Sequence, residues 1–300
     1  MKLQKNSTLL SLVLKVTLLT SMSSYACDIK GITGIVPDNN LKIPVGLKAL
    51  TGGGISEASF NKVIDKVTKI YAPVVKQKGA TLQVVKKWTD GTVNAYAHRE
   101  GNIWYVSMFG GLARHPEITE DAFATVVCHE LGHQIGGAPK KVDPTAGSIW
   151  ASNEGQADYF ATLKCLRKVF ASDRNTEIVK KLKVPADVKI KCEQNYASAE
   201  EQAVCMRSTV AGIALGNFFR VLSGSATVLS ISTPDKKIVK KTYDAHPDSQ
   251  CRVDTYYQGA MCDKDVNENV SDKDENIGTC TKRNGDRIGN RPLCWFKPAA

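Results

Sequence analysis

Three residues of this chain have types and a spacing that suit chemistry at a metal ion. They are His129, Glu130 and His133, in the pattern His-Glu-x-x-His. On a helix, residues four apart share one face, so both imidazole rings would reach one metal ion at roughly 2.0–2.1 Å. The carboxylate of Glu130 would then stand beside the ion as a general base that takes a proton from a zinc-activated water. The pattern therefore predicts a zinc site with a hydrolytic base.

A catalytic zinc ion needs a third protein ligand and keeps one position open. A longer pattern in another peptidase class supplies a third histidine after the second, but here that position is Pro139, which cannot bind metal. Glu154 is the better candidate for the third ligand. Asp158, one helical turn later, would accept a hydrogen bond from a ligating histidine and orient its ring. The alternative is that both are solvent-facing acids, which their apolar neighbours such as Phe160 disfavour.

Glu-x-x-x-Asp after His-Glu-x-x-His resembles the gluzincin pattern of thermolysin-like zinc peptidases. More specifically, the chain is similar to the family that includes the CAAX prenyl protease and the HtpX-type heat-shock protease. Members of that family show an Asn-Ala-Phe-Ala-like strand, a short edge strand, a Gly-Leu pair, the zinc helix, and a His-Pro segment followed by Arg. The matching segments here are Asn94-Ala95-Tyr96-Ala97, residues 103–106, Gly111-Leu112, residues 127–132 and residues 246–253.

The resemblance implies a role for each matching side chain. Glu154 would be the third zinc ligand, and Asp158 would support a ligating histidine. His246 would lie near the open metal position, where it would steady the oxyanion or occupy that position. Arg252 would support the active site. As a lone His-Pro in a loop, His246 is also compatible with an ordinary structural role.

The activity implied by the resemblance is that of an exported zinc-dependent endopeptidase acting on protein or peptide substrates. The chain departs from the membrane-embedded relatives, because no segment reads as a spanning helix. The competing hypothesis is a non-catalytic envelope protein, an adhesion or scaffold module with a structural zinc site. A structural site normally has four protein ligands and no open position. Glu130 has no purpose in such a site, so its presence favours the enzyme.

The apolar periodicity predicts an α+β fold, with a small antiparallel sheet beside the zinc helix and a helical subdomain behind it. Helices are expected from Ser56, as N-cap, to Gly79, from about 120 to 135 with Thr119 as N-cap, and over residues 152–170 and 200–220. Strands are expected at residues 81–88, 92–97 and 102–107. Asp90-Gly91 reads as a hairpin turn, and residues 102–107 as an edge that takes an extended peptide by strand addition. His98 and His115 are expected in exposed loops.

Composition places the chain among ordinary globular proteins, with 300 residues and a formal net charge of +10. The basic residues are spread along the chain and no nucleic-acid motif accompanies them, so no nucleic-acid partner is expected. No pattern indicates an oligomeric state. Residues 1–26 read as a signal peptide, with Lys2 and Lys5 before an apolar stretch and Ala26 at the cleavage site. Cys27 would be the first mature residue, either free or lipid-modified, which would attach the protein to a membrane.

Nine cysteines in an exported chain predict disulfides. Without Cys27 eight remain, and pairing in sequence order gives Cys128–Cys165, Cys192–Cys205, Cys251–Cys262 and Cys280–Cys294. The expected organisation is a signal peptide at 1–26, a zinc metallopeptidase domain at 27–253 and a disulfide-held extension at 254–300. The expected location is the periplasm or envelope, with free secretion as the alternative.

Overall fold

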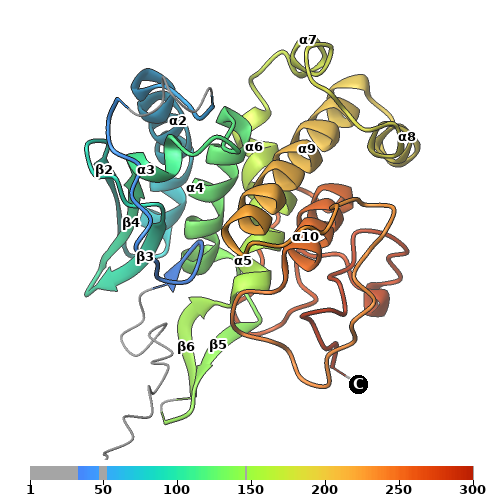
Figure 1. Ribbon diagram of the computed structural model, residues 1–300. Coiled ribbons are helices and arrows are strands. Elements are labelled where there is room, and N and C mark those ends of the chain that lie inside the picture. Colours follow the sequence, from blue (N-terminus) through green and yellow to red (C-terminus); the bar gives the residue numbers. More distant parts are fainter. Residues whose placement is uncertain (1–32, 47–52, 146, 300) are drawn as a thin grey trace, which may run out of the picture.

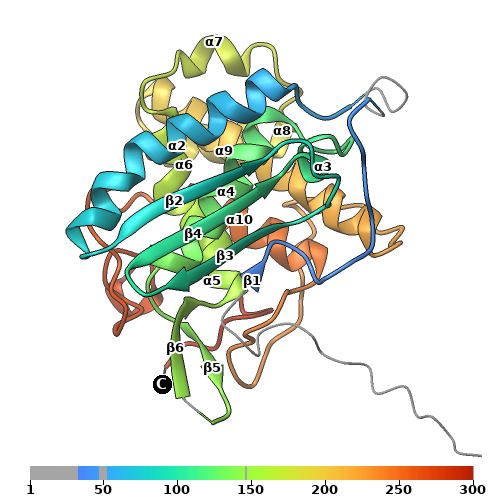
Figure 2. The ribbon, with the colours of Figure 1, turned by 90° about the vertical axis from the view of Figure 1, so that its left-hand side faces the viewer.

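A computed structural model describes residues 33–46, 53–145 and 147–299 of the chain. A four-stranded sheet lies on one side of the molecule, and the helices lie behind it and along its margin (Figures 1 and 2). A two-stranded hairpin projects below these layers. The expected α+β class is confirmed. Residues 1–32, with the predicted signal peptide and Cys27, lie outside the described residues.

The elements follow one another from a short first strand to a C-terminal segment with a single 3₁₀ turn. The strands are β1 (Thr33–Gly34), β2 (Thr81–Lys87), β3 (Ala95–Glu100), β4 (Ile103–Phe109), β5 (Lys140–Asp143) and β6 (Gly147–Ser152). The helices are α2 (Glu57–Gln77), α3 (Gly110–Ala113), α4 (Glu120–Ile135), α5 (Glu154–Phe160), α6 (Leu166–Phe170), α7 (Asn175–Val179), α8 (Ala186–Asn195), α9 (Ala199–Leu222) and α10 (Ser249–Met261).

The two helices predicted most sharply begin where the sequence indicated. The side chain of Ser56 accepts a hydrogen bond from the amide of Ser59 at the start of α2, and Thr119 does the same for Ala122 at the start of α4. Such N-caps satisfy amides that have no partner within the helix. The periodic apolar residues of α2, among them Phe60, are buried against the core. The helix predicted over residues 152–170 is α5, a π-helical turn (Ala161–Cys165) and α6 in succession.

The strand order differs from the predicted succession. The sheet runs β1-β3-β4-β2, with β3 antiparallel to β4 and β2 parallel to β4. Asp90-Gly91 is therefore not a hairpin turn, because the chain crosses there to the other side of β4. The expectation that residues 102–107 form an edge is wrong. β4 is the most buried strand and takes the centre, whereas β2 ends in exposed lysines, which suit an edge.

Four disulfides hold the helical part and the C-terminal segment. Cys128–Cys165 and Cys192–Cys205 are confirmed, but the other pairs are Cys251–Cys294 and Cys262–Cys280, so the sequential pairing of these four is wrong. Cys251 lies in α10 and Cys262 caps its end. Eleven residues of helix separate their Cα atoms by about 16 Å, which is too far for a disulfide.

The C-terminal segment is packed onto the rest of the chain. Trp295 is completely buried, and the indole lies against Gly155 at the start of α5. α10 runs through the predicted domain boundary at Val253. In the described part of the chain, no helix is long and apolar enough to cross a membrane. The segment after Cys262 has little regular secondary structure, and two disulfides hold it.

Candidate metal centre

The candidate centre forms where α4 meets the start of α5. His129 and His133 lie on one face of α4, and Glu154 is the first residue of α5, after the N-cap Asn153. The two helices approach closely at Gly132, where an added Cβ would lie 2.8 Å from the Cα of Ala157. A larger residue at position 132 would therefore push Glu154 away from the histidines.

Three ligand atoms converge at this place. The Nε2 atoms of His129 and His133 lie 3.1 Å apart, and Nε2 of His129 is 3.2 Å from Oε2 of Glu154. Nε2 of His133 is 3.6 Å from Oε1 of Glu154. Atoms bound tetrahedrally to one zinc ion at about 2.0–2.1 Å lie about 3.3 Å from one another. All three side chains are 0% exposed, so a buried His-His-Glu group here has the spacing to hold a metal ion.

The outer nitrogens of both rings are fixed by hydrogen bonds. Nδ1 of His129 lies 2.7 Å from Oδ1 of Asp158, and Nδ1 of His133 donates to the carbonyl of Ser152 at 2.8 Å. When each ring carries its proton on Nδ1 alone, its Nε2 lone pair faces the centre. Burial lowers the pKa of His133 to about 3. Burial also opposes the charge on His129, but Asp158 and Glu154 outweigh it and raise its pKa to about 9.

Glu130 is the unusual member of the group. Its side chain is 0% exposed, and neither carboxylate oxygen has a hydrogen-bond partner within the described residues. Burial raises its pKa to about 8. A carboxyl group without a partner in the interior is costly to ionise. It is suited to holding a proton and passing it on, because its two protonation states are both accessible near neutral pH.

Asp158 is the centre of a buried network behind the candidate metal ligands. Arg252 donates to it through Nε and Nη2 at 2.7 and 2.8 Å, and the hydroxyl of Tyr256 donates to the same carboxylate. Burial opposes the charge on Asp158, but Arg252 and His129 lower its pKa to about 2. Arg252 thus fixes the carboxylate of Asp158, which in turn contacts the ring of His129. Tyr256 was not predicted, although it follows Arg252 by one helical turn.

Two further side chains border Glu154. Nε2 of His246 lies 3.3 Å from its Oε2 and donates a hydrogen bond to the carbonyl of Gly34 at 2.8 Å. Nζ of Lys141 lies 2.9 Å from its Oε1. Burial opposes ionisation of Glu154, but His246 and Lys141 hold its pKa well below the usual range. The structure thus brings His246 beside the candidate ligand Glu154. Lys141 was missed, because nothing in its local sequence marks it.

The remaining histidines lie elsewhere. The expectation of an exposed loop is wrong for His115, which is 6% exposed and packs edge-on against Phe218. It is also wrong for His98, which lies in β3 and stacks on Tyr105. Two other groups of potential ligands in the described ranges consist of acids beside Cys251 and Cys294 or beside Cys280. Those cysteines are bonded in disulfides, and thus lack the thiolate that binds metal.

Comparisons with protein-family models, with curated proteins and with solved structures gave no match for this chain.

Proposed function

We propose that the protein is an exported zinc-dependent endopeptidase, related to the gluzincins. The observation that carries the proposal is Glu130, a buried carboxyl beside three converging ligand atoms that has no hydrogen-bond partner among the described residues. The His-His-Glu donor set suits zinc. A chain that needed the metal only for stability would gain nothing from an unpartnered acid at this place.

When bound, zinc supplies a Lewis acid that polarises the scissile carbonyl and makes water acidic near neutral pH. His129, His133 and Glu154 would hold the ion, and Asp158 keeps the ring of His129 in its binding orientation. Glu130 takes a proton from the attacking water and gives it to the leaving amine. The Nε2–H of His246 points at a carbonyl oxygen in this structure, and it would donate to the carbonyl oxygen of a substrate. Arg252 and Tyr256 position Asp158.

A structural zinc site is the second candidate, and one observation favours it. His246 lies 3.3 Å from Glu154, so a turn of its ring away from Gly34 would bring a fourth ligand to the ion. Four protein ligands without an open position are typical of structural zinc. This candidate would make the protein the non-catalytic envelope module considered above.

Glu130→Gln separates the two candidates, because glutamine keeps the size of the side chain but cannot take a proton. Zinc content and fold should be unchanged, while hydrolysis of unfolded casein should fall by roughly 10²–10⁴-fold. Glu193→Gln, an exposed carboxylate on α8, is the matched control. A folded, zinc-loaded Glu130→Gln protein that cleaves as fast as the wild type would refute the mechanism.

The location of the protein forms part of the proposal. Four disulfides indicate an oxidising, extracytoplasmic environment. We expect signal cleavage after Ala26 and a mature chain that begins at Cys27, in the periplasm or attached to the envelope by lipid. Mass spectrometry of the mature N-terminus tests both points, and an intact Met1 on exported protein would contradict them.

A further inference from the structure

The proposed active site is closed to solvent in this structure. Glu130 and the three ligand side chains are 0% exposed, whereas an endopeptidase must bring a peptide carbonyl beside them. Some segment must therefore move before a peptide reaches the site. Residues 34–39, which we call the latch, contact both His246 and Arg252 beside the candidate site.

The latch lies along β3 as an added strand. Gly34 pairs with Tyr96 in antiparallel register, and the amide of Ile35 donates to the carbonyl of Ala95 at 3.1 Å. The side-chain amide of Asn94 replaces the next backbone pair, since it accepts from the amide of Val36 at 3.3 Å and donates to its carbonyl at 3.1 Å. An extended peptide adds to the open edge of a sheet through the same kind of contact.

Two successive backbone carbonyls of the latch accept hydrogen bonds from side chains of the candidate site. Gly34 accepts from Nε2 of His246, and Ile35 accepts from Nη1 of Arg252, both at 2.8 Å. The same nitrogen of His246 also lies 3.3 Å from Oε2 of Glu154, so one side chain links the Gly34 carbonyl to a candidate ligand. The latch therefore occupies the position along β3 from which a peptide carbonyl would meet His246.

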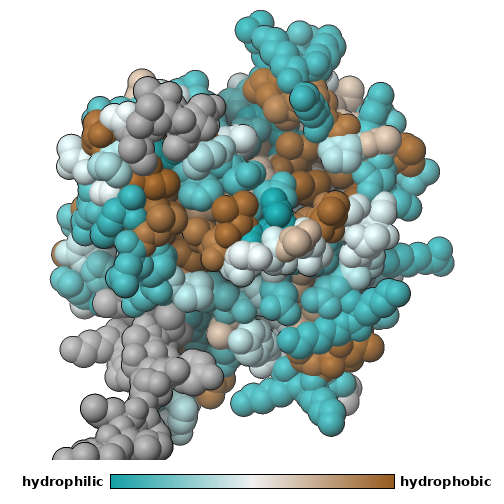
Figure 3. All heavy atoms as spheres, in the orientation of Figure 1, coloured by the Kyte–Doolittle hydropathy of each residue, from teal (hydrophilic) through white to brown (hydrophobic). Residues whose placement is uncertain are grey.

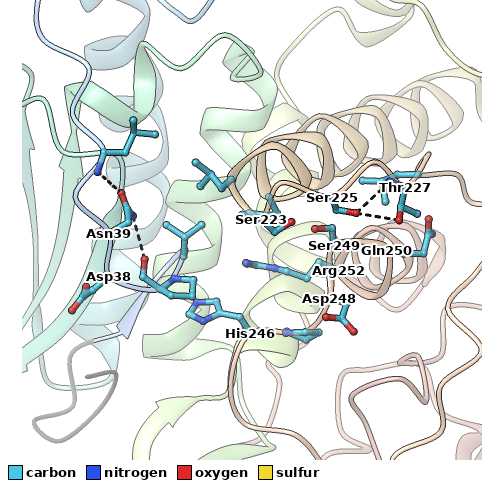
Figure 4. A pocket seen from close by; sticks show the side chains of 17 residues that line it. Asp38, Asn39, Ser223, Ser225, Thr227, His246, Asp248, Ser249, Gln250 and Arg252 are labelled. Atoms are coloured by element: carbon cyan, nitrogen blue, oxygen red, sulfur yellow. Dashed lines mark hydrogen bonds between the residues drawn. The ribbon is translucent and has the colours of Figure 1, made fainter. Parts of the chain in front are cut away.

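A cavity of about 720 Å³ lies between residues 36–39 of the latch and the C-terminal end of α9. Figure 4 shows Asp38 and Asn39 on one side of it, Ser223 and Ser225 on the other, and His246 and Arg252 between them. Apolar side chains gather on this face between the sheet and the C-terminal end of α9 (Figure 3). They include Val36, Leu41, Phe219, Leu222 and Leu229, all of which line the cavity.

From these contacts we infer that the latch occupies the position along β3 in which a peptide substrate would bind. The enzyme cleaves a peptide only after the latch has left β3. The inference rests on the proposed function for its account of activity. Burial of Ile35 in the main core keeps the latch closed at rest. The cavity gives side chains of an incoming extended peptide a place beside His246. The latch thereby limits both access of peptides and escape of zinc.

Gly34→Val tests the inference, because even a Cβ at Gly34 would lie 2.9 Å from Cε1 of Tyr96 and 3.1 Å from the carbonyl oxygen of Ala95. Loss of zinc to a chromogenic chelator should become roughly tenfold faster, which corresponds to about 1.4 kcal/mol. The rate of casein hydrolysis should also increase. Thr81→Val, at the exposed start of the opposite edge strand, is the matched control and should leave both rates unchanged.

A synthetic peptide with the sequence of residues 33–41 provides a second test of the inference. It should inhibit casein hydrolysis by Gly34→Val and slow the release of zinc from it. If Gly34→Val does not fold, Asp38→Ala replaces it, since this change removes the acceptor of the Tyr96 hydroxyl from the exposed end of the latch. A smaller increase in zinc release is then expected.

A folded Gly34→Val protein that releases zinc at the wild-type rate would refute the inference about the latch. If Asp38→Ala is used instead, release of zinc at the wild-type rate from that variant would refute it as well. Failure of the proposed function has a different signature. If neither wild type nor variant cleaves casein, the peptidase proposal loses support, whereas faster zinc release from the variant still supports the latch. The two results are read separately because the chelator measurement needs no substrate.

Discussion

Arg252 and Asp158 form a bidentate ion pair in the interior, with both nitrogen–oxygen distances between 2.7 and 2.8 Å. The pair joins α10 to α5 across the chain, and Asp158 also contacts the ring of His129. A planar guanidinium holds a carboxylate in one orientation. The orientation of the His129 ring, a candidate metal ligand, thus depends on Arg252, which lies 94 positions after Asp158 in the sequence.

Asp158→Asn should weaken zinc binding without abolishing it. The amide keeps the shape of the side chain but loses the charge that makes His129 a strong ligand. We expect an affinity for zinc roughly 10–100-fold lower, measured by competition with a chelator of known affinity. Asp65→Asn, an exposed carboxylate on α2, is the control and should bind as the wild type does. Equal affinity in all three proteins would show that Asp158 does not support the ligand.

Glu154→Ala should remove most of the zinc. Two imidazoles remain, and a tetrahedral zinc site with two protein ligands exchanges its metal readily. Elemental analysis should find about one zinc per wild-type chain and far less in the variant. Circular dichroism must show that the variant is folded, because the change removes the buried ion pair between Lys141 and Glu154. Full zinc content in a folded Glu154→Ala protein would exclude Glu154 as the third ligand.

The local sequence predicted that two candidate ligands share one face, because their spacing is a property of one helix. His129 and His133 are four residues apart, and the capping residues Ser56 and Thr119 act within one turn. Contacts between distant segments carry no such local signal. Lys141 reaches Glu154 from a hairpin that was not predicted, and Tyr256 reaches Asp158 from α10.

The strand order and two of the disulfides also depend on contacts between distant segments, so local sequence did not predict them. Asp90-Gly91 suits a hairpin by residue type, but burial of β4 on both sides decides which strand lies in the centre. Short sequence separation favoured Cys251–Cys262, whereas the rigid helix between them keeps the two sulfurs apart. Helix α10 was not predicted, and for this reason the pairing could not be corrected from the sequence.

Peptide mapping of the oxidised protein should recover the pairs Cys251–Cys294 and Cys262–Cys280. Trypsin cuts after Arg252 and Lys264, so it places Cys251 and Cys262 in different peptides. Mass spectrometry without reduction should then find two linked pairs that separate on reduction. A linked pair that joins Cys251 to Cys262 would contradict this connectivity.

Glu130→Gln should stabilise the zinc-free protein, and more so at pH 8 than at pH 5. The pKa of Glu130 rises from 4.5 to about 8 on folding, because the carboxyl is buried. Between these values the folded chain keeps a proton that the unfolded chain releases, so wild-type stability falls as pH rises. Glutamine does not titrate, so the stability of the variant does not fall with rising pH for this reason.

The expected difference is of the order of a few kcal/mol at pH 8 and much smaller at pH 5. Urea unfolding of both zinc-free proteins at the two pH values measures it, with Glu193→Gln as the exposed control. Bound zinc should reduce the difference, because the positive ion favours the ionised carboxylate. If wild type and Glu130→Gln show the same dependence of stability on pH without zinc, Glu130 is not the buried, unpartnered carboxyl on which the proposed chemistry depends.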